Sequence, residues 1–266
     1  MYKSNRKVVA AITLSGLLMA LSIAVQRFLV IPFGMPSLYR LSLGNVPIIL
    51  ASLFLGPIYG GIVGAGADVV GATLFPVANF LPWPLISSTL YGILPWLFMR
   101  GMFVIRKKMK FSLIYPLLAL IFILLEVYIF TNPSIRHPFD RNLPPIVFDT
   151  NFRIFFSIIL VALMAILIFV FIYLEKKYGE KVNLTYTGKP SELGLILLVM
   201  ATLIEVIWGS WWKMSAFGTS FFVSVFFHTA IMFVLLPFQV SLIAILGNVF
   251  ARSSIHQLLT DQNHRD

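Results

Sequence analysis

The sequence predicts an all-α integral membrane protein, a helical bundle that crosses the bilayer several times. Two observations support this fold class: 59% of the 266 residues are hydrophobic, and only 11% are charged. A soluble domain carries about 25% charged residues and about half apolar ones. Because a membrane-spanning helix needs about 20 apolar residues, the chain has material for several spans. The composition excludes a soluble enzyme, a disordered tail and a nucleic-acid-binding domain.

We expect eight spans. The first follows three basic residues and is longer than the apolar region of a signal peptide, which has about 7–15 residues. The second and third are short and meet at the Gly56-Pro57 turn, so they tilt or form a re-entrant pair. Pro237 predicts a kink in the last span. The expected spans cover residues 8–33, 44–55, 58–74, 83–103, 112–130, 154–174, 193–212 and 221–250.

The basic residues lie mainly on one side of this predicted bundle. An even number of spans places both termini on the same side, which then holds fourteen of the 20 Lys and Arg residues, against five on the other. Lys and Arg are enriched in cytoplasmic loops, so we expect both termini in the cytoplasm. The net charge of +10 therefore reflects topology and indicates no nucleic-acid partner.

The sequence contains no motif for catalysis, nucleotide hydrolysis or metal binding. The Gly188-Lys189 pair is not a phosphate-binding loop, since Asn183 replaces the first glycine and Pro190 replaces the Ser or Thr. The chain has no cysteine, and its four histidines lack the spacing of metal ligands. We therefore expect no enzyme activity, no cofactor and no ATP hydrolysis by this chain.

Most polar residues within the spans fall in the half of the bundle that we expect to face outward. Charged groups at membrane depth usually face a cavity or a partner. These residues predict an outward-facing cup for a small, aromatic and anionic ligand, held by stacking and by cationic side chains. The candidate binding residues are Arg27, Arg40, Asn45, Asn79, Trp83, Glu205, Trp208 and His228.

These candidates also have interpretations that need no ligand. Interfacial Trp residues anchor helices in the bilayer, and Arg27 and Arg40 can extend to lipid headgroups. Glu205 can pair with a basic group inside the bundle, and His228 can be a hydrogen-bonded core residue. The sequence leaves both interpretations open, and for Asp68 it favours a structural contact between helices.

Two stripes of small residues recur at four-residue spacing. Such stripes let helices approach closely in a membrane. They predict either packing inside the bundle or a docking face for another membrane subunit. The stripes are Gly16, Ala20 and Ala24, and Gly56, Gly60 and Gly64.

The runs ALSIAVQRF (20–28), RLSLGNVPIILA (40–51) and LGPIYGGIVGAGAD (55–68) carry a resemblance to a known family. They closely resemble the substrate-binding S components of energy-coupling factor (ECF) vitamin transporters, nearest to the folate subfamily, and the similarity extends to about Gly92. Residues 191–266 are similar more loosely, through Trp208 and the LPFQ run at 236–239. The family usually has six helices, so residues 105–190 represent an insertion of two spans.

The resemblance implies a multi-pass cell-membrane subunit that binds folate or a related small metabolite. It implies three partner chains, a transmembrane T subunit and two cytoplasmic ATPases, with Ala20 and Ala24 contacting the T subunit. The chain departs from the family near the expected pocket: His228 falls where an Arg is frequent, and Glu205 where an uncharged polar residue is common.

Two other functions remain as alternatives. A stand-alone, proton-coupled secondary transporter could use Glu205 or Asp68 as a proton relay, although no internal repeat is evident in the sequence. A membrane enzyme acting on lipid would need a nucleophile or a metal cluster, and the sequence suggests neither.

Overall fold

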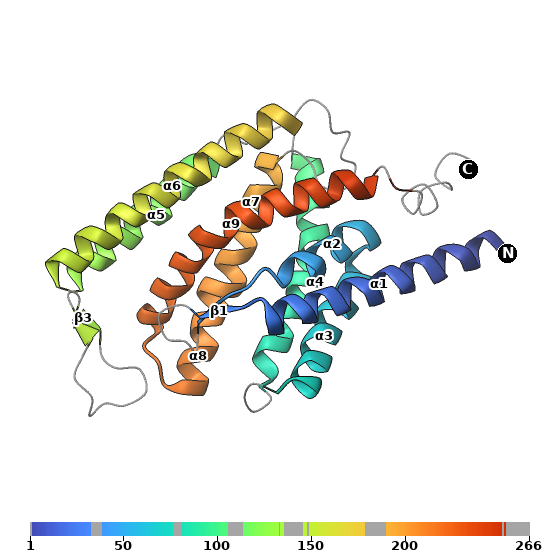
Figure 1. The fold of residues 1–266 in the computed structure, drawn as a ribbon, viewed down its shortest axis with the longest axis horizontal. Coiled ribbons are helices and arrows are strands. Elements are labelled where there is room, and N and C mark those ends of the chain that lie inside the picture. The colour runs from blue at the N-terminus through green and yellow to red at the C-terminus, as the bar shows by residue number, and fades with distance from the viewer. Residues whose placement is uncertain are drawn as a thin grey trace.

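The computed structural model is a bundle of helices with two short antiparallel β-hairpins (Figure 1). It describes residues 2–32, 39–76, 81–105, 114–132, 134–135, 146–147, 149–178, 190–251 and 253. The elements are α1 (Tyr2–Phe28), β1 (Ile31–Pro32), β2 (Arg40–Leu41), α2 (Asn45–Leu55), α3 (Pro57–Leu74), α4 (Pro82–Ile105), α5 (Ile114–Thr131), β3 (Ser134–Ile135), β4 (Ile146–Val147), α6 (Thr150–Tyr178), α7 (Pro190–Ala201), the π-helix η2 (Thr202–Gly209), α8 (Ser210–Phe217) and α9 (Phe221–Ala251).

Every predicted span contains a helix, which confirms the all-α membrane class. Within the described residues, five helical stretches are long and apolar enough to cross a bilayer, and the number of crossings remains a prediction. These stretches are Asn5–Phe28, Pro57–Leu74, Arg153–Lys177, Pro190–Phe217 and Phe221–Phe250, beside the shorter apolar helices Asn45–Leu55 and Pro116–Tyr128.

The first helix ends earlier than predicted. We expected a span to residue 33, but α1 stops at Phe28. Ile31 and Pro32 pair instead with Leu41 and Arg40, so β1 and β2 form a hairpin at the end of α1. Apolar residues are compatible with both a helix and a strand, and the pairing partner lies too far along the chain for a local pattern to reveal it.

The turn between α2 and α3 has the predicted form. α2 ends at Leu55 and α3 begins at Pro57. Gly56 between them has φ +93°, a backbone conformation that side chains disfavour. Proline fits the first turn of a helix, where its missing N–H leaves no hydrogen bond unmade.

The stripe of glycines in α3 packs inside the bundle. A Cβ atom at Gly60 would lie 2.1 Å from the carbonyl oxygen of Gly92 in α4, and one at Gly64 would lie 2.1 Å from that of Ser88. Only glycine allows two helix backbones to approach this closely. The α3–α4 contact is therefore a close approach of two helix backbones.

The stripe of small residues in α1 lies on an exposed face of the helix, unlike the buried stripe in α3. Gly16, Ala20 and Ala24 are all exposed, and a Cβ atom at Gly16 would meet nothing within 4 Å. The buried face of the same helix carries Ser22, which is fully buried, and Leu18. This stripe therefore lies on an exposed face of α1 in the described part of the chain.

Helices α5 and α6, which the sequence predicts to be an insertion, form a layer on the far side of the bundle from α1 (Figure 1). α6 packs mainly on α9 and α7. Leu167 and Phe171 of α6 are almost fully buried, and Phe156 packs on Phe226 of α9, with their ring centroids 5.7 Å apart. α9 continues as a helix through Pro237.

Candidate functional site

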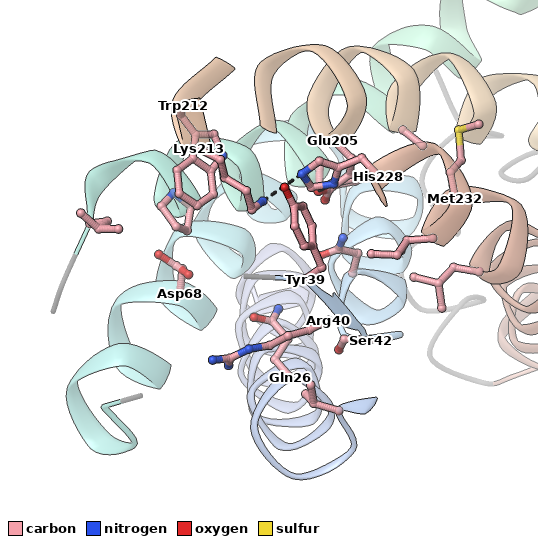
Figure 2. A pocket seen from close by; sticks show the side chains of 18 of the residues that line it. Gln26, Tyr39, Arg40, Ser42, Asp68, Glu205, Trp212, Lys213, His228 and Met232 are labelled. Atoms are coloured by element: carbon pink, nitrogen blue, oxygen red, sulfur yellow. Dashed lines mark hydrogen bonds and ion pairs between the residues drawn. The ribbon is translucent and has the colours of Figure 1, made fainter. Parts of the chain in front are cut away.

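A polar cavity of about 370 Å³ lies where the ends of several helices and the β1–β2 hairpin meet (Figure 2). Its wall brings together α1, α2, α3, α4, η2, α8 and α9, which lie up to about two hundred residues apart in the sequence. The polar residues lining it are Gln26, Arg27, Tyr39, Arg40, Ser42, Asn45, Asp68, Tyr91, Glu205, Trp212, Lys213, His228 and Gln239.

Five of the eight predicted binding residues line this cavity. They are Arg27, Arg40, Asn45, Glu205 and His228. The structure therefore brings together residues that are far apart in the sequence.

The other three predicted residues do not line the cavity wall. Trp83 and Trp208 lie beside it in a cluster with Trp211, which we call the Trp cluster. Its ring centroids lie 5.2–5.8 Å apart. Asn79 lies outside the described residues.

The side chains of Ser22 and Gln26 hold the α1–α2 side of the cavity. Ser22 donates a hydrogen bond to the carbonyl oxygen of Gly44 over 2.8 Å, and Gln26 donates to the Ser22 hydroxyl over 2.9 Å. A Cβ atom at Gly44 would lie 2.0 Å from the Gln26 side chain. Glycine at this position thus lets the start of α2, with Asn45, lie against the end of α1, with Arg27.

A row of charged and polar groups, buried at Lys213 and His228 and partly exposed at Glu205, crosses the other side of the cavity. The Lys213 ammonium donates a hydrogen bond to Nε2 of His228 over 2.9 Å. Nδ1 of the same ring lies 3.7 Å from Oε2 of Glu205. Tyr91 and Asn45 make hydrogen bonds to the Glu205 carboxylate. The row thus runs from Asn45 at the start of α2 to Lys213 in the middle of α8, and Figure 2 shows its Lys213–His228 contact.

Tyr39 fixes the β1–β2 hairpin to α9. Its side chain is 1% exposed, its ring stacks on Phe227 with centroids 4.7 Å apart, and its hydroxyl donates to Ser224 over 2.8 Å. Burial raises the pKa of the Tyr39 hydroxyl, an effect that the hydrogen bond to Ser224 opposes. The hydroxyl therefore stays a neutral donor at physiological pH.

A second charged pair lies between α1 and α3. Arg27 interacts electrostatically with Asp68, which is 8% exposed and lines the cavity. The guanidinium extends over Gly71, where an added Cβ atom would lie 3.1 Å from Nε. Asp68 fits the structural contact that the sequence favoured for it, and it also reaches the cavity wall.

Sequence reasoning missed the role of several cavity residues. Lys213, Tyr39 and Tyr91 were not among the residues predicted to bind a ligand. The positions of Lys213 and Tyr39 depend on the π-helix η2 and on the hairpin, which no local pattern indicated. Among the described residues, no group of three or more His, Cys, Asp or Glu side chains could hold a metal ion.

Comparison with known proteins supports the resemblance seen in the sequence. The sequence model of the family described as "ECF-type riboflavin transporter, S component" matches residues 6–139, half of the chain. The folate transporter FolT of Clostridium novyi (strain NT) is 26% identical over 110 residues, which are 41% of this chain and 59% of that relative. The match thus spans less than two-thirds of the relative's length. No solved structure matches the chain.

The family match begins in α1 and includes all of α2, α3 and α4, the helices that form one side of the cavity. It assigns the chain to a class of multi-pass cell-membrane transport proteins rather than to an enzyme class. The protein belongs to the family of ECF-type riboflavin transporter S components.

Proposed function

We propose that the chain is the substrate-binding subunit of an ECF-type transporter and that its polar cavity binds a small vitamin of the folate type. The observation that carries this proposal is the convergence of Arg27, Arg40, Asn45, Glu205 and His228 on one cavity. A pocket of a few hundred Å³ with a few directed polar groups is typical of a small-molecule site.

Folate is the preferred vitamin for two reasons. The relative from Clostridium novyi is a folate transporter. The cavity also combines aromatic surfaces with the cations Arg27, Arg40 and Lys213, which suit a planar ligand that carries carboxylates. Riboflavin, named in the family description, is the competing vitamin.

We propose an arrangement with eight spans and both termini in the cytoplasm, so that the cavity opens outward. The excess of Lys and Arg on the terminal side supports this orientation. The start of α1 and the end of α9 lie on the same side of the bundle (Figure 1). Residues 1–104 and 191–266 then form the S-component core, and residues 105–190 form an addition to it.

The proposed partners are a transmembrane T subunit and two cytoplasmic ATPases. This chain has no phosphate-binding loop in its sequence, so another subunit must hydrolyse ATP. The exposed small residues Gly16, Ala20 and Ala24 offer a helix surface that a partner helix can approach closely.

The test is calorimetric titration of the purified protein in detergent with folic acid. We expect saturable binding by the wild type and its loss in Ala72→Phe, which places a ring in the cavity wall of α3. The matched control is Ala162→Phe on the exposed face of α6, which should bind as the wild type does. Equal binding by Ala72→Phe would place the site elsewhere, and binding of riboflavin alone would change the vitamin but keep the class.

A further inference from the structure

Lys213 is a buried cation in the wall of the cavity, and the binding site derived from the sequence did not include it. It belongs to α8, its side chain is 6% exposed, and it lines the cavity (Figure 2). An ammonium group removed from water destabilises a protein by several kcal/mol unless charges and hydrogen bonds compensate for the loss of hydration. The contacts of Lys213 therefore indicate the function of its buried ammonium group.

The described part of the chain uses only some of the hydrogen-bonding capacity of Lys213. An ammonium group has three N–H donors. Among the described residues, His228 Nε2 is the one acceptor within hydrogen-bond distance, at 2.9 Å. Aromatic rings occupy two further sides: Nζ lies 4.4 Å from the ring centroid of Trp212 and 5.4 Å from that of Tyr39. Rings attract a cation through their faces but do not replace a hydrogen-bond acceptor.

Glu205 is the counter-charge of Lys213, and its carboxylate is held by other groups. The carboxylate interacts with Tyr91 and Asn45 through hydrogen bonds and with Lys213 electrostatically. No ion pair within 4.0 Å joins Lys213 and Glu205 among the described residues, since His228 stands between them. Glu205 therefore balances the charge of Lys213 without occupying its free donors.

His228 orients the ammonium group. Because an ammonium only donates, Nε2 of His228 must accept, which places the ring proton on Nδ1, toward Glu205. The ring is fixed on its other sides: Tyr39 packs edge-on at 5.4 Å between centroids, and a Cβ atom at Gly209 would lie 3.2 Å from Nε2. Glycine at position 209 thus gives the imidazole room beside η2.

We propose that Lys213 is the residue that binds the acidic group of the ligand, and that His228 and Glu205 are positioning residues behind it. The two N–H groups that His228 does not use take a carboxylate oxygen of the ligand, between the rings of Trp212 and Tyr39. This inference rests on the proposed function, since it concerns the same cavity. It assigns His228 and Glu205, both predicted to contact ligand, to a supporting role.

The proposal predicts the class of vitamin. A carboxylate of the ligand accepts hydrogen bonds from the remaining N–H groups of Lys213 and balances its charge. An uncharged ligand supplies no negative charge to this buried cation. Folic acid carries carboxylates and riboflavin is uncharged. The cavity should therefore select folic acid over riboflavin at neutral pH, and Lys213 should be the main source of that selection.

The experiment compares folic acid and riboflavin binding to the purified full-length protein by calorimetry. The variants are Lys213→Met, Lys213→Arg and the charge-balanced double variant K213M/E205Q, which removes the cation together with its counter-charge. Lys176→Met, at an exposed position in the last turn of α6, is the matched control. A thermal-unfolding measurement on each variant reports whether it is folded.

We expect the wild type to bind folic acid at least about 30-fold more tightly than the Lys213→Met and double variants do. Loss of one partner of a buried charge pair typically weakens binding by this much or more. Lys213→Arg should recover part of the affinity, and Lys176→Met should match the wild type. Unchanged folic acid binding by folded K213M/E205Q would overturn the role of Lys213 and leave the proposed function intact. Preference of the wild type for riboflavin would overturn the anionic class, and failure to bind either vitamin would overturn both proposals.

Discussion

Gly60 of α3 and Gly92 of α4 contact each other backbone to backbone. A Cβ atom at Gly92 would lie 2.0 Å from the Gly60 carbonyl oxygen, and a Cβ atom at Gly60 would lie 2.1 Å from the Gly92 carbonyl oxygen. Both helices carry cavity residues, namely Asp68 on α3 and Tyr91 on α4. This contact therefore fixes the relative position of two cavity walls.

Gly92→Leu is expected to destabilise the protein, because a side chain there meets backbone that cannot move aside. Overpacking in a well-packed interior costs about 1–3 kcal/mol, and a clash with backbone lies at the upper end of that range. A lower thermal-unfolding temperature in detergent would confirm it. The control is Gly101→Leu in the same helix, where an added Cβ atom meets nothing within 4 Å. Equal stability of the two variants would contradict the α3–α4 contact.

Ala20→Leu is expected to weaken the association with a T subunit and to leave vitamin binding unchanged. The side chain is exposed on the small-residue stripe of α1, so a larger side chain there mainly disturbs the approach of a partner helix. We expect about tenfold less T subunit to co-purify, which corresponds to a loss of about 1.4 kcal/mol. Ala162→Leu on α6 serves as the control. Full recovery of the complex with Ala20→Leu would remove α1 as the docking face.

Tyr39→Phe is expected to loosen the β1–β2 hairpin without unfolding the bundle. The variant keeps the ring stack on Phe227 and removes the hydrogen bond to Ser224, worth about 1 kcal/mol. Amide hydrogen exchange in the hairpin should accelerate about fivefold, since this bond contributes to holding the hairpin closed. Because burial raises the Tyr39 pKa, the wild-type hairpin should show no change in protection between about pH 6 and 9 beyond intrinsic exchange. Unchanged exchange in the variant would show that the bond does not anchor the hairpin.

Ligand binding is expected to quench tryptophan fluorescence mainly through Trp212. Of the five tryptophans, Trp212 lines the cavity, whereas Trp96 does not and packs beneath Arg100 in the second half of α4. Trp212→Phe should therefore lose most of the quenching by folic acid, and Trp96→Phe should keep it. The reverse result would place the ligand away from the α8 wall.

The helices could be predicted from the sequence because each apolar run is long enough to require its own hydrogen-bonded backbone in a membrane. The turn at Gly56-Pro57 could be predicted from the glycine–proline pair itself, which is also a local signal. The end of α1 was wrong by several residues, because Ile31 and Pro32 pair with residues 40–41, and apolarity alone does not distinguish that strand from more helix.

The cavity could be predicted only in part. Arg27, Asn45 and Glu205 stand out as polar residues in an apolar sequence, and the ends of the first two spans place Arg27 and Asn45 at the same face of the bundle. Lys213 and Tyr39 could not be assigned, since they looked like ordinary residues at a span end and in a loop. Their place depends on how η2, α8 and the hairpin pack against α9, which is a property of tertiary contacts.

Uptake of radiolabelled folic acid into liposomes tests the central claim most directly. The chain is reconstituted alone, and also with a T subunit and two ATPases, with ATP supplied on the side of the ATPases. We predict ATP-dependent uptake by the complete complex and none by the chain alone, with or without a proton gradient. Proton-driven uptake by the chain alone would contradict the account and would identify a stand-alone secondary transporter.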